Sequence, residues 1–127
     1  DRKLKLIDNF NLKYKHINKF DLLSRSYKLT INDWVSYYYY TDFIITDSFH
    51  GMVFSIIFNK EFVVLINDDR GRDRFESLCN ILGLEDRLIS LDQDIIPDFK
   101  KINYTEINEK LRLLKIKSKK FLLDTLE

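Results

Sequence analysis

The sequence has little of several residue types, and each shortage narrows the class of protein. Its 127 residues include one cysteine, one proline, three glycines and no alanine. The single thiol, Cys79, allows no internal disulfide and no multi-thiolate metal site, which favours a reducing compartment, most simply the cytoplasm. The absence of alanine, beside abundant lysine, isoleucine and asparagine, indicates the codon usage of an AT-rich genome and says nothing about activity.

Long apolar runs and an excess of charge are also missing. The longest nearly apolar run, residues 52–58, is far shorter than the roughly 20 residues that a membrane-spanning helix needs. The first residues lack the apolar stretch of a secretory signal, and without an initiator methionine they suggest a piece of a longer protein. Because 21 basic residues balance 20 acidic ones, binding to nucleic acid or to an anionic membrane is not indicated.

The chain does contain enough apolar sequence for one compact domain, since 45% of its residues are hydrophobic. Two β-branched and aromatic runs, residues 43–46 and 62–66, are apolar on both faces, as central parallel strands are. A third short strand is predicted at residues 88–90. Short alternating patches in residues 3–25 predict one edge strand with loops.

A helix is predicted before the first of these strands. Thr30 stands three residues before Asp33, which is an N-cap arrangement, and apolar residues follow at helical spacing to about residue 40. This helix ends in four consecutive tyrosines, residues 37–40. Tyrosine rings at helical spacing are predicted to cover the edge of a core rather than to stack on a ligand.

Further helices are predicted between and after the strands. In residues 73–82 one apolar stripe includes Cys79, which is therefore expected in the core, and Gly83 follows as a C-terminal stop. Asn103, three residues before a glutamate, opens a long final helix of about residues 104–126. The lysines clustered in its C-terminal half are predicted to form a solvated face.

This alternation of helices and strands predicts an α/β fold with a Rossmann-like parallel sheet flanked by helices. Ligands of such sheets bind beyond the carboxyl ends of the strands. Only three strands are clear, which is few for a free-standing domain of this class. We therefore expect residues 1–127 to form a single α/β domain that is one half of a larger architecture.

The loop that follows the first central strand, residues 47–51, leads straight into a helix. A helix N-terminus stabilises an anion such as phosphate or carboxylate. Ser48 can cap this helix, Gly51 permits close backbone approach, and a neutral His50 can donate or accept a proton near neutral pH. The alternative is that Ser48 merely caps a buried helix and His50 fills a hydrogen-bonded niche. His16 is assigned no function.

The loop that follows the second central strand, residues 67–74, carries three arginines and three aspartates. The planar fork of arginine suits bidentate recognition of carboxylate or phosphate, and Arg70 and Arg74 are stronger candidates than Arg72. The alternative is a set of surface ion pairs that contribute little. If the two strands are neighbours in the sheet, the two loops converge.

Taken in order, these residues resemble the C-terminal half of the polysaccharide pyruvyl transferase family. The resemblance covers residues 34–89. It rests on a Trp-led helix, the sequence Thr-Asp-Ser-Phe-His-Gly at 46–51, the strand 62–66, the paired Arg-Gly and Arg-Phe of 70–75, and Leu-Gly-Leu before Asp-Arg at 82–87. The ordered set is far more specific than any one of its parts.

The resemblance implies the donor-binding half of a fold like that of the B-type glycosyltransferases, with the N-terminal domain missing here. It implies a bacterial, cytoplasmic enzyme of exopolysaccharide biosynthesis. Such an enzyme transfers a pyruvyl group from phosphoenolpyruvate to hydroxyls of a saccharide and forms a ketal, with no cofactor. It also implies that the isolated chain turns over little.

The resemblance implies roles for five residues of the two loops. His50 would be the catalytic acid and base or the contact to the donor phosphate, and Ser48 and Gly51 would shape the anion site at the helix start. Arg70 and Arg74 would bind the phosphate or the carboxylate of the donor.

Two positions depart from the family pattern. Met52, where a small hydroxyl residue is common, is expected to alter the wall of the pocket. Glu61, where proline often follows the lysine, is expected to be a change in a surface turn. Two other functions stay open: a B-type glycosyltransferase that uses a nucleotide-sugar donor, and a non-catalytic interaction domain of the same fold.

Overall fold

The computed structural model of the chain describes residues 2–13, 19–21, 30–66, 71–93 and 96–126. Its strands are β1 (Lys19–Asp21), β2 (Phe43–Thr46), β3 (Glu61–Ile66) and β4 (Leu88–Ser90). Its helices are α1 (Arg2–Lys13), α2 (Ile31–Tyr40), α3 (Phe49–Ile57), α4 (Arg72–Leu82) and α5 (Tyr104–Leu126), with a short 3-10 helix, η1 (Glu85–Arg87), before β4. The predicted α/β fold with a Rossmann-like parallel sheet is confirmed.

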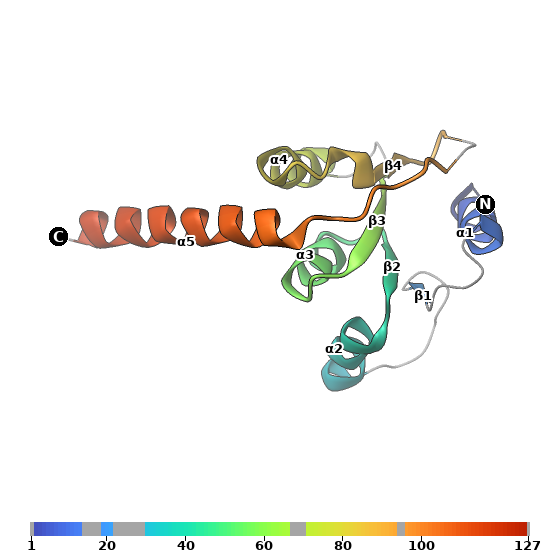
Figure 1. Cartoon of the computed structure of the whole chain (residues 1–127), viewed down its shortest axis with the longest axis horizontal. Coiled ribbons are helices and arrows are strands. Elements are labelled where there is room, and N and C mark those ends of the chain that lie inside the picture. Colours follow the sequence, from blue (N-terminus) through green and yellow to red (C-terminus); the bar gives the residue numbers. More distant parts are fainter. Residues whose placement is uncertain (1, 14–18, 22–29, 67–70, 94–95, 127) are drawn as a thin grey trace.

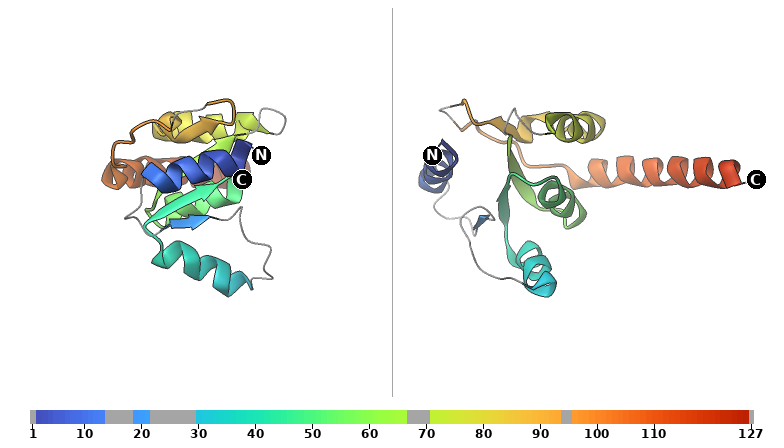
Figure 2. Two further views of the ribbon diagram at one scale, coloured as in Figure 1. Left: turned by 90° about the vertical axis from the view of Figure 1, so that its right-hand side faces the viewer. Right: turned by 180° about the vertical axis from the view of Figure 1, so that it is seen from behind.

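The four strands form one parallel sheet in the order β1-β2-β3-β4, so each strand lies beside its predecessor in sequence. Helices α2, α3 and α4 all cover the same face of this sheet (Figure 1), whereas α1 lies on the opposite face (Figure 2). Thr46 pairs with Val64, and Ile66 pairs with Ser90. The carboxyl ends of β2, β3 and β4 therefore lie along one edge of the sheet.

The sheet separates two hydrophobic cores, and β3 contributes to both. Phe62, Val64 and Ile66 pack against helices α2 to α5, whereas Val63 and Leu65 pack on the side of α1. All five side chains are at most 4% exposed. Burial on both faces is the physical reason that β3 is continuously apolar rather than alternating.

The prediction of loops for residues 3–25 is wrong over residues 3–13, which belong to α1. Leu6 and Ile7 of this helix are buried in the second core, where they cover the face of the sheet opposite to α3. The neighbouring alternating patches hide the helical signal of this segment in the sequence. The predicted edge strand is β1.

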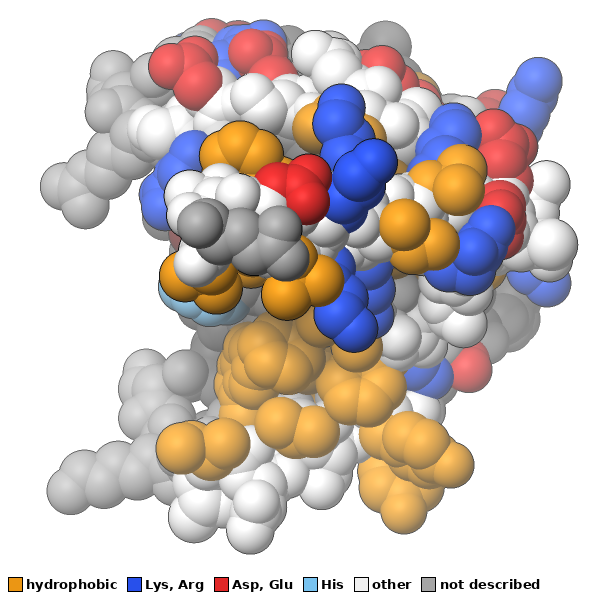
Figure 3. Space-filling model, turned by 90° about the vertical axis from the view of Figure 1, so that its left-hand side faces the viewer, with side chains coloured by type: hydrophobic (Ala, Val, Ile, Leu, Met, Phe, Trp, Pro, Cys, Tyr) orange, Lys and Arg blue, Asp and Glu red, His pale blue; other side chains and the backbone are white. Residues whose placement is uncertain are grey.

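Helix α2 begins as predicted, but fewer of its tyrosine side chains are buried than its sequence indicates. Thr30 and Asp33 form a reciprocal capping box. Tyr38 is fully buried, whereas Tyr39 and Tyr40 are 64% and 74% exposed. The expectation that the whole tyrosine run covers a core edge is therefore wrong for its last two residues. Hydrophobic side chains remain at the surface over α2 and α3, in the lower half of the face shown in Figure 3.

The bounds of helices α4 and α5 agree with the prediction to within one residue, but the two helices differ in how many of their apolar side chains are buried. In α4, Cys79 is fully buried, and burial raises the pKa of its thiol to about 12. Gly83 ends this helix in the left-handed conformation at φ 71°. Helix α5 extends away from the sheet (Figure 1), so Ile107 is buried while Phe121 and the leucines near the C-terminus are exposed. The apolar stripe of α5 is therefore core only in its first turns.

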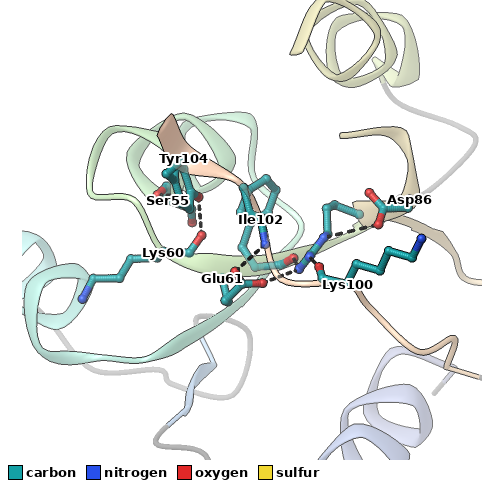
Figure 4. A network of polar contacts seen from close by, with 9 residues as sticks. Ser55, Lys60, Glu61, Asp86, Lys100, Ile102 and Tyr104 are labelled. Atoms are coloured by element: carbon teal, nitrogen blue, oxygen red, sulfur yellow. Dashed lines mark hydrogen bonds and ion pairs between the residues drawn. The ribbon is translucent and has the colours of Figure 1, made fainter. Parts of the chain in front are cut away.

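Glu61 is the first residue of β3, at the end of the strand opposite to the edge where β2, β3 and β4 end. Its carboxylate joins several groups in a polar network that was not predicted from the sequence (Figure 4). Its carboxylate accepts a hydrogen bond from Arg87 at 2.8 Å and another from the backbone N–H of Ile102 at 2.8 Å. Arg87 is 1% exposed and also donates to the carbonyls of Phe62 and Lys100. The interpretation of Glu61 as a surface turn change is therefore wrong, because its charge balances a buried guanidinium.

The junction between β2 and α3 is tight because Gly51 has no side chain. A Cβ at this position would lie 2.2 Å from Thr46 Oγ1, well inside any permitted contact. The same Thr46 hydroxyl accepts a hydrogen bond from the Ser48 amide at 3.1 Å, and Ser48 Oγ in turn accepts one from the Gly51 amide at 3.4 Å. The end of the strand and the first turn of α3 are thus fixed to each other.

Removing the Glu61 carboxylate should destabilise the fold because it leaves the buried Arg87 guanidinium with only the more distant and exposed Asp86 carboxylate, at 3.7 Å. We expect Glu61→Ala to lower the free energy of unfolding by about 3–5 kcal/mol, measured by urea denaturation. The matched control is Glu106→Ala, which removes an exposed pair with Lys110 and should cost at most about 1 kcal/mol. Equal losses for the two variants would show that the network does not hold the fold.

A side chain at position 51 should separate α3 from β2. We expect Gly51→Ala to lower the free energy of unfolding by about 1–3 kcal/mol through overpacking against Thr46. In a Thr46→Ala background the penalty should shrink, since the hydroxyl that the new Cβ meets is gone. Urea denaturation of the two single variants and the double variant measures this coupling, and strictly additive losses would contradict it.

Candidate functional site

The strands and helices that flank the two loops predicted to carry the chemistry lie at one edge of the sheet. Strands β2 and β3 are parallel neighbours, and both end at this edge. The helices that follow them, α3 and α4, therefore begin side by side on one face (Figure 1). Residues 67–70 lie outside the described part of the chain, so the prediction for Arg70 has no structural counterpart here.

The first turn of α3 offers backbone donors to an anion. Ser48 is the N-cap, and its own amide and that of Gly51 are already bonded within the junction. The amides of Phe49 and His50 have no acceptor among the residues that the structure describes. Two free N–H groups at the positive end of a helix dipole stabilise a bound phosphate or carboxylate.

Arg74 lies beside this turn and is held there by an aromatic ring. Its guanidinium carbon is 5.4 Å from the centroid of the Phe49 ring, a cation–π contact. The ring itself packs edge-to-face on Phe75 at 5.6 Å, which anchors it to α4. Arg74 is exposed and has no carboxylate partner among the described residues, whereas Arg72 forms an ion pair with Glu76 at 2.6 Å. Arg74 is thus the described cation available to a ligand at the start of α3.

His50 is exposed and lies on the other side of the same turn. It lines a groove of about 430 Å³ together with residues of α2 and α3 and the α2 cap: Thr30, Ile31, Trp34 and Phe54. Consecutive residues of α3 therefore face different neighbours, because Phe49 contacts α4 while His50 borders the groove against α2. A proton donor or acceptor at position 50 therefore lies between the Arg74 side of the turn and the aromatic residues of the groove.

The predicted candidates thus divide into those that the structure brings together and those it does not. The structure brings together four of them: the start of α3 holds Ser48, His50 and Gly51, and the neighbouring start of α4 holds Arg74. Gly51 is buried, and the close approach that it permits is to Thr46. The expectation that Met52 forms a pocket wall is wrong, since it is fully buried with its sulfur 3.7 Å from Cys79 Sγ.

Two aromatic residues that shape the site were not predicted from the sequence. Phe49 carries the Arg74 contact, and Trp34 faces the groove beside His50. Both are apolar residues within helical stripes, where burial is the ordinary interpretation. For Phe49 the one available signal was its position, because it is the first residue of a helix that follows a strand end.

Within the described ranges, no group of three or more His, Cys, Asp or Glu side chains could hold a metal ion. None of the described helices combines the length and apolar content that crossing a bilayer requires.

Comparison with known proteins bears on the identity of the chain. The family model for polysaccharide pyruvyl transferase matches residues 2–69. The match begins upstream of the resembling stretch 34–89, includes Ser48, His50 and Gly51, and ends before Arg70 and Arg74. Searches of curated proteins and of solved structures gave no significant match. Because the matched residues make up more than half of the chain, it belongs to the polysaccharide pyruvyl transferase family.

Proposed function

We propose that this chain binds phosphoenolpyruvate at the start of α3 and takes part in pyruvyl transfer to a saccharide. The observation that carries the proposal is the juxtaposition of the exposed Arg74, the exposed His50 and two helix-start amides that have no acceptor among the described residues. Phosphoenolpyruvate carries a phosphate and a carboxylate, so it needs two anion contacts and a proton donor. The described residues of this turn supply groups of each kind.

The transfer has a defined balance of bonds and protons. Two hydroxyl oxygens of the saccharide form bonds to C2 of the enolpyruvyl group, and the C2–O bond to phosphate breaks. One hydroxyl proton ends on the methylene carbon, which becomes the methyl group of the ketal, and the other leaves with the released phosphate. General acid and base catalysis therefore has two tasks, one at the methylene carbon and one at the hydroxyls.

Roles follow from where each group lies. The Phe49 and His50 amides and Arg74 bind the anionic groups of the donor. Arg70, which lies outside the described residues, is proposed as a further cation on the family resemblance alone. Ser48 and Gly51 fix the turn that presents those amides. His50 transfers the proton, since its imidazole sits at the rim of the groove beside the anion site.

We further propose that the chain is the donor-binding half of a two-domain enzyme, whose N-terminal domain supplies the other wall of the cleft. The acceptor would be a precursor of a bacterial exopolysaccharide, and the reaction would take place in the cytoplasm. No cofactor beyond the donor substrate enters this scheme. The isolated chain would then bind the donor but turn over little.

Donor binding can be tested by thermal unfolding of the chain. At about ten times its Kd, phosphoenolpyruvate should raise the Tm by about 3–6 °C, because ligand binding to the native state alone stabilises it by about 1.4 kcal/mol. Arg74→Ala and His50→Ala should abolish the shift. Both side chains are exposed, so neither substitution should lower the Tm of the free chain appreciably.

The control variant is Arg112→Ala, which removes an exposed arginine of α5 that is paired with Glu109. It should leave the shift unchanged. A shift that survives Arg74→Ala and His50→Ala would place the donor elsewhere. A nucleoside diphosphate that displaces phosphoenolpyruvate from the chain would favour a glycosyltransferase instead.

A further inference from the structure

The groove beside His50 differs in character from the anion site on the other side of α3. The described residues that line it are Thr30, Ile31, Trp34, His50 and Phe54. None of them carries a permanent charge. The Thr30 hydroxyl is already bonded to the Asp33 carboxylate at 2.7 Å, so the His50 imidazole and the Trp34 indole N–H are the polar groups of this described lining that remain for a ligand.

We propose that this groove binds a sugar ring of the acceptor, with the Trp34 indole as its stacking surface. The inference rests on the proposed function, and it adds the place where the second substrate lies. Stacking places the apolar C–H face of the ring on the indole, and the ring hydroxyls then project from its edge toward His50.

Charge indicates which of the two substrates the groove binds. The donor has two anionic groups, and the described residues that line the groove offer no cation to hold them. The exposed cation, Arg74, lies on the Phe49 side of the turn, away from the groove. A neutral saccharide suits the groove because its hydroxyls carry no charge to desolvate and its C–H faces bury apolar surface. His50 would then contact both substrates.

Trp34 is held rigidly enough to act as a platform. Its indole packs at 4.6 Å from the Tyr38 ring and edge-to-face at 4.8 Å on Phe54, and Tyr38 is fully buried. Little side-chain entropy is therefore lost when a ligand stacks on it. At the groove mouth, Ile31 is 82% exposed, so its side chain can be changed without disturbing the core.

The test uses the intrinsic fluorescence of the chain, because Trp34 is its only tryptophan. The probes are the methyl glycosides of glucose, galactose, mannose and N-acetylglucosamine, with octyl glucoside as an alkyl-chain comparison. At least one methyl glycoside should change the emission saturably. Ile31→Asp should weaken that response about tenfold, because it places a hydrated carboxylate at the groove mouth.

The matched control is Ile57→Asp, which adds the same charge at a 60% exposed position of α3 outside the groove lining and should leave the response within about twofold of the unsubstituted chain. No saturable change with any methyl glycoside, an equal response in both variants, or a response to octyl glucoside alone would overturn the inference.

Thermal stabilisation by phosphoenolpyruvate, measured on the same samples, separates this inference from the proposed function. If phosphoenolpyruvate still stabilises the chain when the glycosides fail, only the acceptor groove is disproved. If phosphoenolpyruvate stabilises neither the unsubstituted chain nor Ile57→Asp, the proposed function itself fails.

Discussion

The contact between Gly51 and Thr46 is the constraint on which the candidate site depends. Because a Cβ at position 51 would meet the threonine hydroxyl, α3 can lie directly on the end of β2 only with glycine there. The same hydroxyl bonds the Ser48 amide, so strand end, cap and first turn form one rigid unit. The backbone amides of Phe49 and His50 are thereby held at a fixed place on the edge of the sheet.

That fixed turn divides the site into two chemically different sides. Phe49 contacts α4 and the Arg74 guanidinium, whereas His50 borders the groove against α2, whose described lining residues are uncharged. The proposed reaction between an anionic donor and a neutral acceptor would use such a division, with His50 at the boundary as the proposed proton-transferring group. The Glu61–Arg87 network lies at the opposite end of β3 and stabilises the fold without touching this turn.

Much of the fold could be predicted from the sequence, because β2, β3 and the caps of α2 and α4 are encoded locally by apolar runs, Thr30 with Asp33, and Gly83. The predictions failed where contacts between residues far apart in the sequence determine the structure. The role of Glu61 depends on Arg87, 26 residues away, and α1 is a helix that covers a sheet formed later in the chain.

The site shows the same division between local and long-range information. Ser48 and Gly51 could be placed from their spacing at a strand end, and the resemblance to the family, now shown, pointed to His50 and Arg74. The part played by Phe49 and Trp34 could not be predicted, because both are apolar residues whose neighbours come from other helices. The exposed half of α5 likewise departs from its apolar pattern because no other described element reaches it.

The central claim is that the start of α3 binds the donor, and backbone amide chemical shifts test it most directly. In a ¹⁵N-labelled chain titrated with phosphoenolpyruvate, the largest changes should fall on the amides of Phe49 and His50 and on the Arg74 side chain. Changes confined instead to the pocket between α4 and α5, which Lys101 and Lys110 line, would contradict it.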